Sequence, residues 1–233
     1  MLFRVAVLFA FSLLCSCASL PEKHCAPLTI PYTREAIDAD GILNESCYQT
    51  YPPMDCFVVA GDPSRLPPKT RAWLFWNEDA LVCTFKCEDD SPAFLTSSTD
   101  EREVDIQDRA EIFIWHQELV PVYYCIEAAP GGAVHDYEAR FYRKFDDCWS
   151  PEGGWEYSAR RTSAGYNIEM VFPQKAMKAM GIHLCAGCSF QLGLFRADYD
   201  ALDGTPVWIT WVDHGREPDF HTADSFGTAV LAR

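Results

Sequence analysis

The chain has 233 residues, a formal net charge of −15 and an aromatic content of 14%. Because so acidic a protein repels polyanions, the composition argues against nucleic acid, anionic lipid and sulfated glycan as partners. The seven tryptophans are generous for the needs of a core, and rings of this kind suit the apolar faces of a neutral ligand.

The N-terminus has the pattern of an export signal. Arg4 precedes an apolar run, Val5–Leu14, that is too short to span a bilayer as a finished helix. The letters LCSC close the run and resemble a bacterial lipobox, in which the last cysteine is lipidated and becomes the new N-terminus. We therefore expect a signal peptide over residues 1–16, lipidation of Cys17, and an anchor and tether over residues 17–26.

This signal also predicts a location. Ala18 follows the expected anchor, at a position where an aspartate would favour retention in the inner membrane. We expect an exported protein that meets the membrane only through its lipid, at the outer membrane, and that faces the periplasm or the cell surface. An ordinary secretory signal that is cleaved near Ala18 is the alternative.

Strand signals and turn signals alternate along the rest of the chain. The expected strands lie near Thr29–Thr33, Thr70–Trp76, Leu81–Cys87, Ala110–His116, Val122–Ala128, Tyr137–Tyr142, Glu156–Thr162, Tyr166–Phe172, Phe190–Tyr199, Val207–Trp211 and Gly227–Leu231. Only Pro173–Met180 has helical character. We predict one all-β domain over residues 27–233, an antiparallel β-sandwich of about ten strands with one short helix.

Two pairs of cysteines raise a choice between packing and chemistry. Cys83 and Cys87 share one expected strand, where a rise of about 3.3 Å per residue separates their Cα atoms by roughly 13 Å, too far for a disulfide. We expect both to be small apolar core residues. Cys185 and Cys188 form a CxxC in an expected turn with no second pair nearby for zinc, so we expect a local disulfide or two inert thiols.

Six motifs follow one another in a recognisable order. They are IDADGILNES (37–46), TRAWLFWNEDALVCTFKCED (70–89), DIQDRAEIFI (105–114), YYCIEAAPGGAVHDYEAR (123–140), GYNIEMVFP (165–173) and DFHTADSFGTAVL (219–231). In this order they resemble the family 9 carbohydrate-binding modules, which are related in fold to the DOMON β-sandwiches. The resemblance spans nearly all of residues 30–233 and implies a β-sandwich that binds sugar.

The resemblance also implies a site in which two aromatic rings sandwich the terminal sugar. A pyranose stacks its C–H faces on aromatic rings and bonds its hydroxyls to charged groups. Glu111 matches a sugar-contacting glutamate of the family, and Phe220 with His221 falls where one sandwich ring is expected. The other ring is replaced by Asp105, so only half of the clamp is expected at its family position.

Further charged residues are candidates for the same surface. Arg109 and Glu111 are two apart and therefore share one strand face. Glu127 lies two residues after Cys125, which stands near the position of a family arginine, and Arg196 could complete a concave polar surface with it. The alternative is a solvated sheet face with exposed ion pairs.

Two tryptophans are candidates for stacking on a sugar. Trp73 shares a strand with Trp76 and points to the opposite face, and Trp76 matches a core tryptophan of the family. Trp211 and Trp208 also point to opposite faces, and we expect Trp211 to be a core residue or a wall of the pocket.

The function expected from these features is non-catalytic binding of a neutral saccharide in glycan capture or degradation. The alternatives are a haem module held by Met170 and His221, a glycoside hydrolase, and a domain for protein contacts only. No cofactor is required, although the resemblance allows structural calcium, for which Asp89 and Asp90 offer oxygen ligands.

Overall fold

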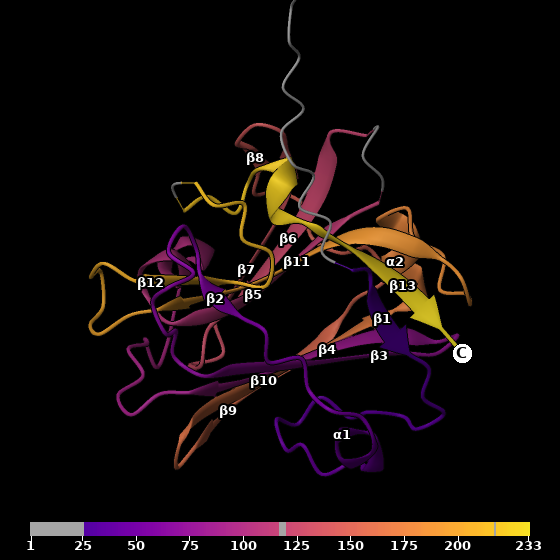
Figure 1. Ribbon diagram of the computed structural model, residues 1–233, viewed down its shortest axis with the longest axis horizontal. Coiled ribbons are helices and arrows are strands. Elements are labelled where there is room, and N and C mark those ends of the chain that lie inside the picture. Colours follow the sequence, from indigo (N-terminus) through magenta and orange to yellow (C-terminus); the bar gives the residue numbers. More distant parts are fainter. Residues whose placement is uncertain (1–25, 117–119, 217) are drawn as a thin grey trace, which may run out of the picture.

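The computed structural model describes residues 26–116, 120–216 and 218–233, and its strands form two β-sheets that pack face to face (Figure 1). The expected signal peptide and the lipidated Cys17 lie outside these residues, so they stay predictions. Among the described helices, none is long and apolar enough to cross a membrane.

Thirteen strands and a few short helices make up the described chain. The strands are β1 (Leu28–Pro31), β2 (Val58–Val59), β3 (Thr70–Trp76), β4 (Ala80–Glu88), β5 (Arg109–Trp115), β6 (Val122–Ala128), β7 (Val134–Arg140), β8 (Lys144–Asp146), β9 (Glu156–Thr162), β10 (Gly165–Pro173), β11 (Ser189–Asp198), β12 (Val207–Thr210) and β13 (Gly227–Ala232). The helices are α1 (Ser46–Thr50), α2 (Gln174–Ala179) and the 3₁₀ turns η1 (Glu101–Ile106) and η2 (Ala223–Ser225). The all-β prediction is confirmed, and each expected strand overlaps an observed one.

The sheets differ in size and connection. The large sheet has nine strands in the order β1-β13-β11-β5-β6-β7-β8, with β12 pairing to β11 and β2 pairing to β12. The small sheet has four strands in the order β3-β4-β10-β9. The pairs are antiparallel as expected, except that β1 runs parallel to β13. This pairing places the first described strand beside the last strand of the chain.

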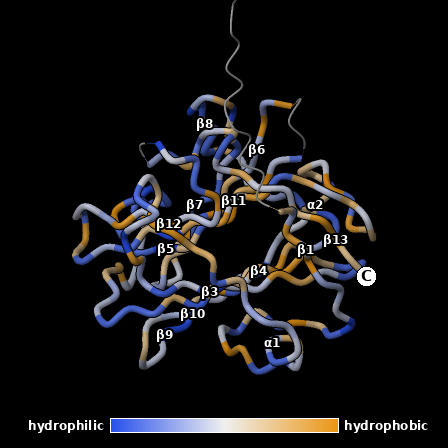
Figure 2. The backbone as a smooth tube through the Cα atoms, viewed as in Figure 1, coloured by the Kyte–Doolittle hydropathy of each residue, from blue (hydrophilic) through white to orange (hydrophobic). Residues whose placement is uncertain are grey.

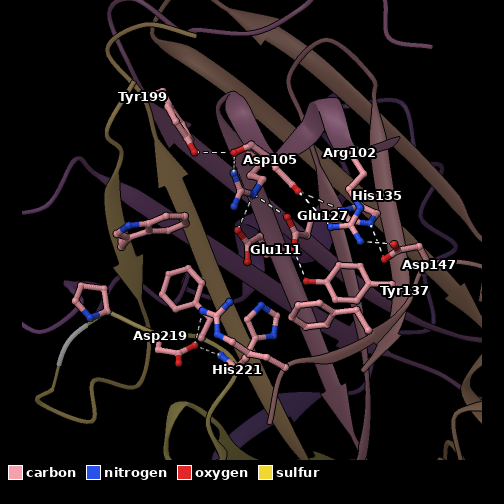
Figure 3. A pocket seen from close by; sticks show the side chains of 16 residues that line it. Arg102, Asp105, Glu111, Glu127, His135, Tyr137, Asp147, Tyr199, Asp219 and His221 are labelled. Atoms are coloured by element: carbon pink, nitrogen blue, oxygen red, sulfur yellow. Dashed lines mark hydrogen bonds and ion pairs between the residues drawn. The ribbon is translucent and has the colours of Figure 1, made fainter. Parts of the chain in front are cut away.

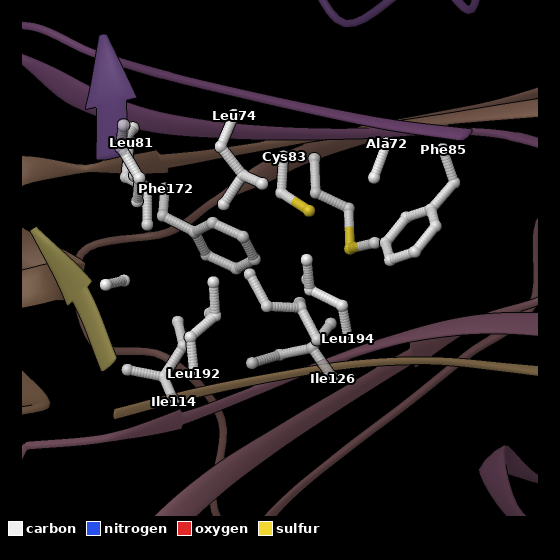
Figure 4. Packing of buried hydrophobic residues seen from close by; sticks show 14 of the residues in the cluster. Ala72, Leu74, Leu81, Cys83, Phe85, Ile114, Ile126, Phe172, Leu192 and Leu194 are labelled. Carbon is white, nitrogen blue, oxygen red and sulfur yellow. The ribbon is translucent and has the colours of Figure 1, made fainter. Parts of the chain in front are cut away.

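The core lies between the two sheets and follows from alternation along each strand. In β5, Ala110, Ile112 and Ile114 point inward and are fully buried. They belong to one buried cluster with Cys83 and Phe172 of the small sheet, and Figure 4 shows Ile114 on the opposite side of this core from Cys83. The expectation that Cys83 packs as an apolar residue is confirmed, and burial raises the pKa of its thiol. Each fully buried Leu or Phe contributes about 1.5–3 kcal/mol.

The hydropathy of the chain follows this layering. Hydrophobic segments concentrate along the central strands, whereas hydrophilic segments lie mainly in the peripheral loops (Figure 2).

Helix α1 covers the outer face of the small sheet, where Cys47 and Tyr48 pack against Trp73 and Phe75. The outer face of the large sheet carries a second cluster of aromatic residues, which includes Phe113, Tyr123, Phe195, Phe220 and Phe226.

Candidate functional site

A polar row crosses the outer face of the large sheet. In register, Glu111 on β5 lies opposite Phe195 on β11 and opposite Glu127 on β6, and Glu127 lies opposite His135 on β7. Directly opposed side chains on neighbouring strands are about 5 Å apart, so the two glutamates would repel each other unless a cation lay between them. The same alternation that sends Ile112 into the core therefore gathers acids on the other face.

Arg109 supplies that cation. It stands two residues before Glu111 on the same face, and its Nε lies 2.8 Å from Glu111 Oε1 and 2.8 Å from Glu127 Oε2. Its Nη1 donates to the carbonyl oxygens of Val104 and Asp105, at 3.4 and 3.1 Å. Burial alone would lower the pKa of Arg109, but the two carboxylates outweigh burial and raise it. Arg109 is therefore a fixed positive charge between Glu111 and Glu127, and these three residues form the floor of the site.

One guanidinium serves two buried carboxylates in this floor. Burial, with the neighbouring Glu127, raises the pKa of Glu111 above its ordinary value, although Arg109 acts against the shift. Tyr137 donates a hydrogen bond of 2.6 Å to Glu127 Oε1. Glu127 Oε2 accepts no hydrogen bond from any described residue, because its contact with Arg109 is an ion pair without hydrogen-bond geometry.

A second charged pair lies beside the floor. His135 Nδ1 is 3.3 Å from Asp105 Oδ1, and its Nε2 is 3.5 Å from Asp147 Oδ1. Burial would lower the pKa of His135, but the bond to Asp105 and the nearby Glu127 raise it overall. Burial would raise the pKa of Asp105, but His135 and the arginines lower it. Asp105, at the position where the resemblance implies a ring, therefore pairs with His135 instead.

An aromatic wall lies beside this floor. It consists of Phe220, from the loop that precedes the last strand, and Trp208, from β12, and it rests on Phe195. Phe220 stacks on Phe195 with ring centroids 4.1 Å apart, and Trp208 meets Phe220 edge to face at 5.4 Å. Gly193 makes room for this arrangement, because a Cβ there would lie 2.4 Å from the ring of Phe195. The wall is therefore supported from below by β11.

His221 lies next to this wall and is held by its neighbours. Its Nδ1 is 2.9 Å from the hydroxyl of Tyr123, and its ring centroid is 4.8 Å from that of Phe145. Burial lowers the pKa of His221 to about 4, so the ring is neutral at neutral pH. Asp219 fixes the loop by accepting hydrogen bonds from the His221 amide and from the Tyr142 hydroxyl.

These groups enclose a pocket of about 370 Å³ on the outer face of the large sheet (Figure 3). The volume lies in the range of small-molecule sites. Polar groups converge at the floor, while Trp208, Phe220, Phe145 and Tyr199 supply aromatic surface. The arrangement can accept hydroxyl hydrogens at the floor and stack an apolar ring face at the wall.

The structure gathers most of the expected binding residues in this pocket and leaves two elsewhere. The pocket brings together Arg109, Glu111, Glu127, Phe220 and His221. Trp73 lies on the small sheet beneath α1, where its Nε1 donates to the carbonyl oxygen of Tyr51. Trp211 packs in the core between the sheets. The binding role of these residues stays a prediction.

Several pocket residues were not anticipated. Trp208, rather than Trp211, lines the pocket, and His135, Tyr137 and Tyr199 were not singled out. Trp208 pairs with Ala197, whose side chain shares the face of Phe195, so alternation carries a signal for it once β12 is placed beside β11. The positions of His135 and Tyr137 depend on the pairing of β6 with β7.

Arg196 does not complete the polar surface as the sequence suggested. It follows Phe195, which points to the pocket, and it pairs with Ala110, which points to the core. Its side chain is 0% exposed and contacts Asp89 and Asp198 between the sheets. The correction follows from alternation, because neighbouring residues of a strand face opposite ways.

Asp89 and Asp90 are the residues expected to offer oxygen ligands to calcium. Asp89 gathers with Asp108 and Asp198, and one oxygen of each lies within 4.8 Å of the others, whereas Asp90 is outside this group. Both carboxylate oxygens of Asp108 accept backbone hydrogen bonds of 2.6 Å, from Ala93 and Tyr199. Because the guanidinium of Arg196 already supplies a positive charge here, the group does not fit a calcium ion.

The ligands of the haem alternative are not brought together. Met170 is fully buried between the sheets, whereas His221 lies on the outer face of the large sheet. The large sheet separates the two side chains, so they cannot bind one iron atom.

Comparison with known proteins agrees with this fold. A model of the family described as "Carbohydrate family 9 binding domain-like" matches residues 38–233. A candidate carbohydrate-binding protein from Bacteroides uniformis has a similar structure, with 18% identity, a TM-score of 0.69, and coverage of 88% of this chain and 98% of that chain. No curated protein matched the chain.

Two further similar structures are of a family 9 carbohydrate-binding module from Caldicellulosiruptor kristjanssonii. Its complex with cellotriose gives a TM-score of 0.62 at 12% identity and covers 89% of this chain and 94% of that chain. Its complex with glucose gives a TM-score of 0.59 at 11% identity, with coverage of 89% and 97%. At these identities the structural matches show a shared fold.

Proposed function

Because the chain belongs to the carbohydrate family 9 binding domain-like proteins, we propose that the pocket on the large sheet binds a saccharide without chemical conversion. One observation carries the proposal, namely that an aromatic wall and buried carboxylates meet in one pocket of about 370 Å³. Phe220 and Trp208 offer faces for the C–H surface of a sugar ring, and Glu111 and Glu127 offer acceptors for its hydroxyls. The module with bound cellotriose or glucose supports this class of ligand.

The arrangement of the acids favours binding over hydrolysis. A glycoside hydrolase places two carboxyl groups about 5–10 Å apart on either side of the scissile bond. Here Glu111 and Glu127 both lie 2.8 Å from Nε of Arg109, which holds the two acids together in the floor of the pocket. This arrangement supports a role for the pair as joint acceptors of ligand hydrogen bonds.

The binding proposal is tested by calorimetric titration of the purified protein with neutral mono- and oligosaccharides. We expect saturable binding to at least one sugar, together with no release of shorter products from the same oligosaccharides. Absence of binding across a broad panel would contradict the proposal. Release of products would favour the hydrolase instead.

We also propose that the protein is exported and held at the outer membrane by a lipid on Cys17, where it takes part in glycan capture. The sequence LCSC after an apolar run supports this proposal. Mass spectrometry of the protein from a membrane fraction should find a lipid on Cys17, and C17S should release the protein from that fraction. An unlipidated N-terminus in the membrane-extracted protein would contradict the anchor.

A further inference from the structure

The charges that line the pocket do not balance. Five carboxylates and three guanidinium groups face it. Two of the arginines each have a carboxylate of their own, because Arg102 contacts Asp147 and Arg143 contacts Asp219. Asp105 pairs with His135, whose imidazole carries a positive charge only when it is protonated. These pairs leave Glu111 and Glu127, which share Arg109.

The uncompensated negative charge therefore lies at the floor of the pocket. Arg109 compensates one of the two glutamates, and both acids are nearly inaccessible, with side-chain exposures of 1% for Glu111 and 5% for Glu127. Glu127 Oε2 accepts no hydrogen bond within the described chain. An uncompensated carboxylate away from water is costly, so this floor favours either a proton or a cationic ligand group.

The other groups around the floor do not remove the deficit. The titratable or charged groups facing Glu111 are Arg109 on its own strand, Glu127 and Cys125 from β6, Tyr137 from β7, Asp105 from η1 and Tyr199 just after β11, and His135 from β7 faces Glu127. The His221 ring at the wall is neutral at neutral pH and adds no charge. Burial, with the neighbouring Glu127, raises the pKa of Glu111, which is the expected response of a buried acid that shares its guanidinium with a second acid.

We propose that the pocket prefers a sugar that carries a free ammonium group over the neutral sugar of the same stereochemistry. The preference rests on the proposed saccharide function, because the ring still needs the wall at Phe220. An ammonium group donates hydrogen bonds and supplies one positive charge, which is the charge that the pair of Glu111 and Glu127 lacks beside Arg109. An N-acetylated sugar of the same ring would supply no charge.

A divalent cation is a less suitable occupant of the same floor. Asp105, Glu127 and His135 offer ligand atoms within 4.8 Å of one another. However, Arg109 Nε lies 2.8 Å from Glu127 and Arg102 Nη1 lies 3.9 Å from Asp105, so two guanidinium groups already occupy the surroundings of these oxygens. Repulsion by these fixed charges favours a monovalent ammonium over a metal ion.

The experiment is a set of paired calorimetric titrations with the purified protein in the presence of a chelator. Glucosamine, galactosamine and mannosamine are compared with glucose, galactose and mannose and with the three N-acetyl sugars. We expect at least one amino sugar to bind about tenfold more tightly than its neutral and N-acetylated counterparts near neutral pH. The ratio should rise from pH 5 toward pH 8, because a proton competes with the ammonium group for Glu111, whose pKa burial raises to about 8.

Proton release and a variant give independent readouts. Titration in buffers of different ionisation enthalpy should show protons released from the floor when the amino sugar binds and none when the neutral sugar binds. E127Q should abolish the tenfold ratio, whereas E138Q, a change outside the pocket, should retain it. A ratio that survives in E127Q would overturn the proposal.

The failures of the two proposals are distinguishable. If neutral and amino sugars bind equally, the preference is wrong and saccharide binding stands. If no sugar of either kind binds, both proposals fail. A preference that appears only without the chelator would assign the floor to a metal ion and would also overturn the proposal.

Discussion

The buried acids of the two sheets have opposite surroundings. On the small sheet, Glu169 accepts hydrogen bonds from the Tyr48 hydroxyl at 2.7 Å and from the Gly41 amide at 2.5 Å, beneath the segment that includes α1. On the large sheet, Glu111 and Glu127 share one guanidinium beside an open pocket. A buried acid with donors on both oxygens holds a loop in place, whereas acids short of donors leave capacity for a ligand.

The largest expected effect is a loss of stability, and it tests the structural role assigned to Glu169. E169A removes the acceptor for Tyr48 and Gly41, so the Gly41 amide loses its partner and the Tyr48 hydroxyl keeps only Thr84 Oγ1 at 2.8 Å. We expect the free energy of unfolding to fall by about 2–4 kcal/mol, while sugar affinity is unchanged. Urea denaturation and calorimetry measure the two quantities. If E169A were stable but no longer bound sugar, Glu169 would serve binding and not stability, which would contradict the roles assigned to the two sheets.

Removal of the aromatic wall is expected to act on binding. F220A loses the stacked ring that Phe195 and Trp208 support, and should weaken sugar binding by about tenfold, the scale of one stacking contact of about 1.4 kcal/mol. W73A is the matched control, since this ring lies on the small sheet and should affect stability without changing affinity. Equal affinity loss in both variants would indicate that general unfolding is being measured.

The titration of Glu111 predicts a pH dependence of stability. Its folded pKa is raised above the ordinary 4.5, so the folded state holds its proton more firmly than the unfolded state does. Its contribution to stability is therefore lost as the pH rises from about 4.5 through the folded pKa. E111Q should remove this loss, so the difference in unfolding free energy between E111Q and the native protein should grow over that range. A constant difference would show that Glu111 does not titrate abnormally.

A smaller effect is expected from a change at Gly193, which lies beneath the aromatic wall. G193A would place a Cβ 2.4 Å from the Phe195 ring and would displace that ring toward Phe220. We expect sugar affinity to fall by a few-fold and stability by about 1–3 kcal/mol, as in overpacked sites. Calorimetry and thermal unfolding check both. Unchanged affinity would mean that the wall does not depend on its support.

The fold was largely predictable because its strands are long and alternate. β3, β6 and β9 have the expected bounds, and the same alternation correctly placed Arg109 and Glu111 on one face. Strands β2 and β8 and helix α1 were missed because segments of two to five residues carry too few positions for a period.

The site was only partly predictable because it depends on pairing between distant strands. Glu111, Glu127 and His135 form one row only through the registers of β5, β6 and β7, which a single sequence does not give. Arg196 was assigned to the wrong face although alternation alone excludes it. Trp208 could not be chosen over Trp211 before β12 was placed against β11.

The most direct test is a sugar titration of E111Q and E169Q beside the native protein. The account predicts that, above the folded pKa of Glu111 of about 8, E111Q weakens binding of the same sugar by about tenfold, the loss of one hydrogen bond to a charged group, and that E169Q binds as the native protein does. Native affinity in E111Q, or equal weakening in both variants, would contradict the claim that the pocket on the large sheet is the binding site.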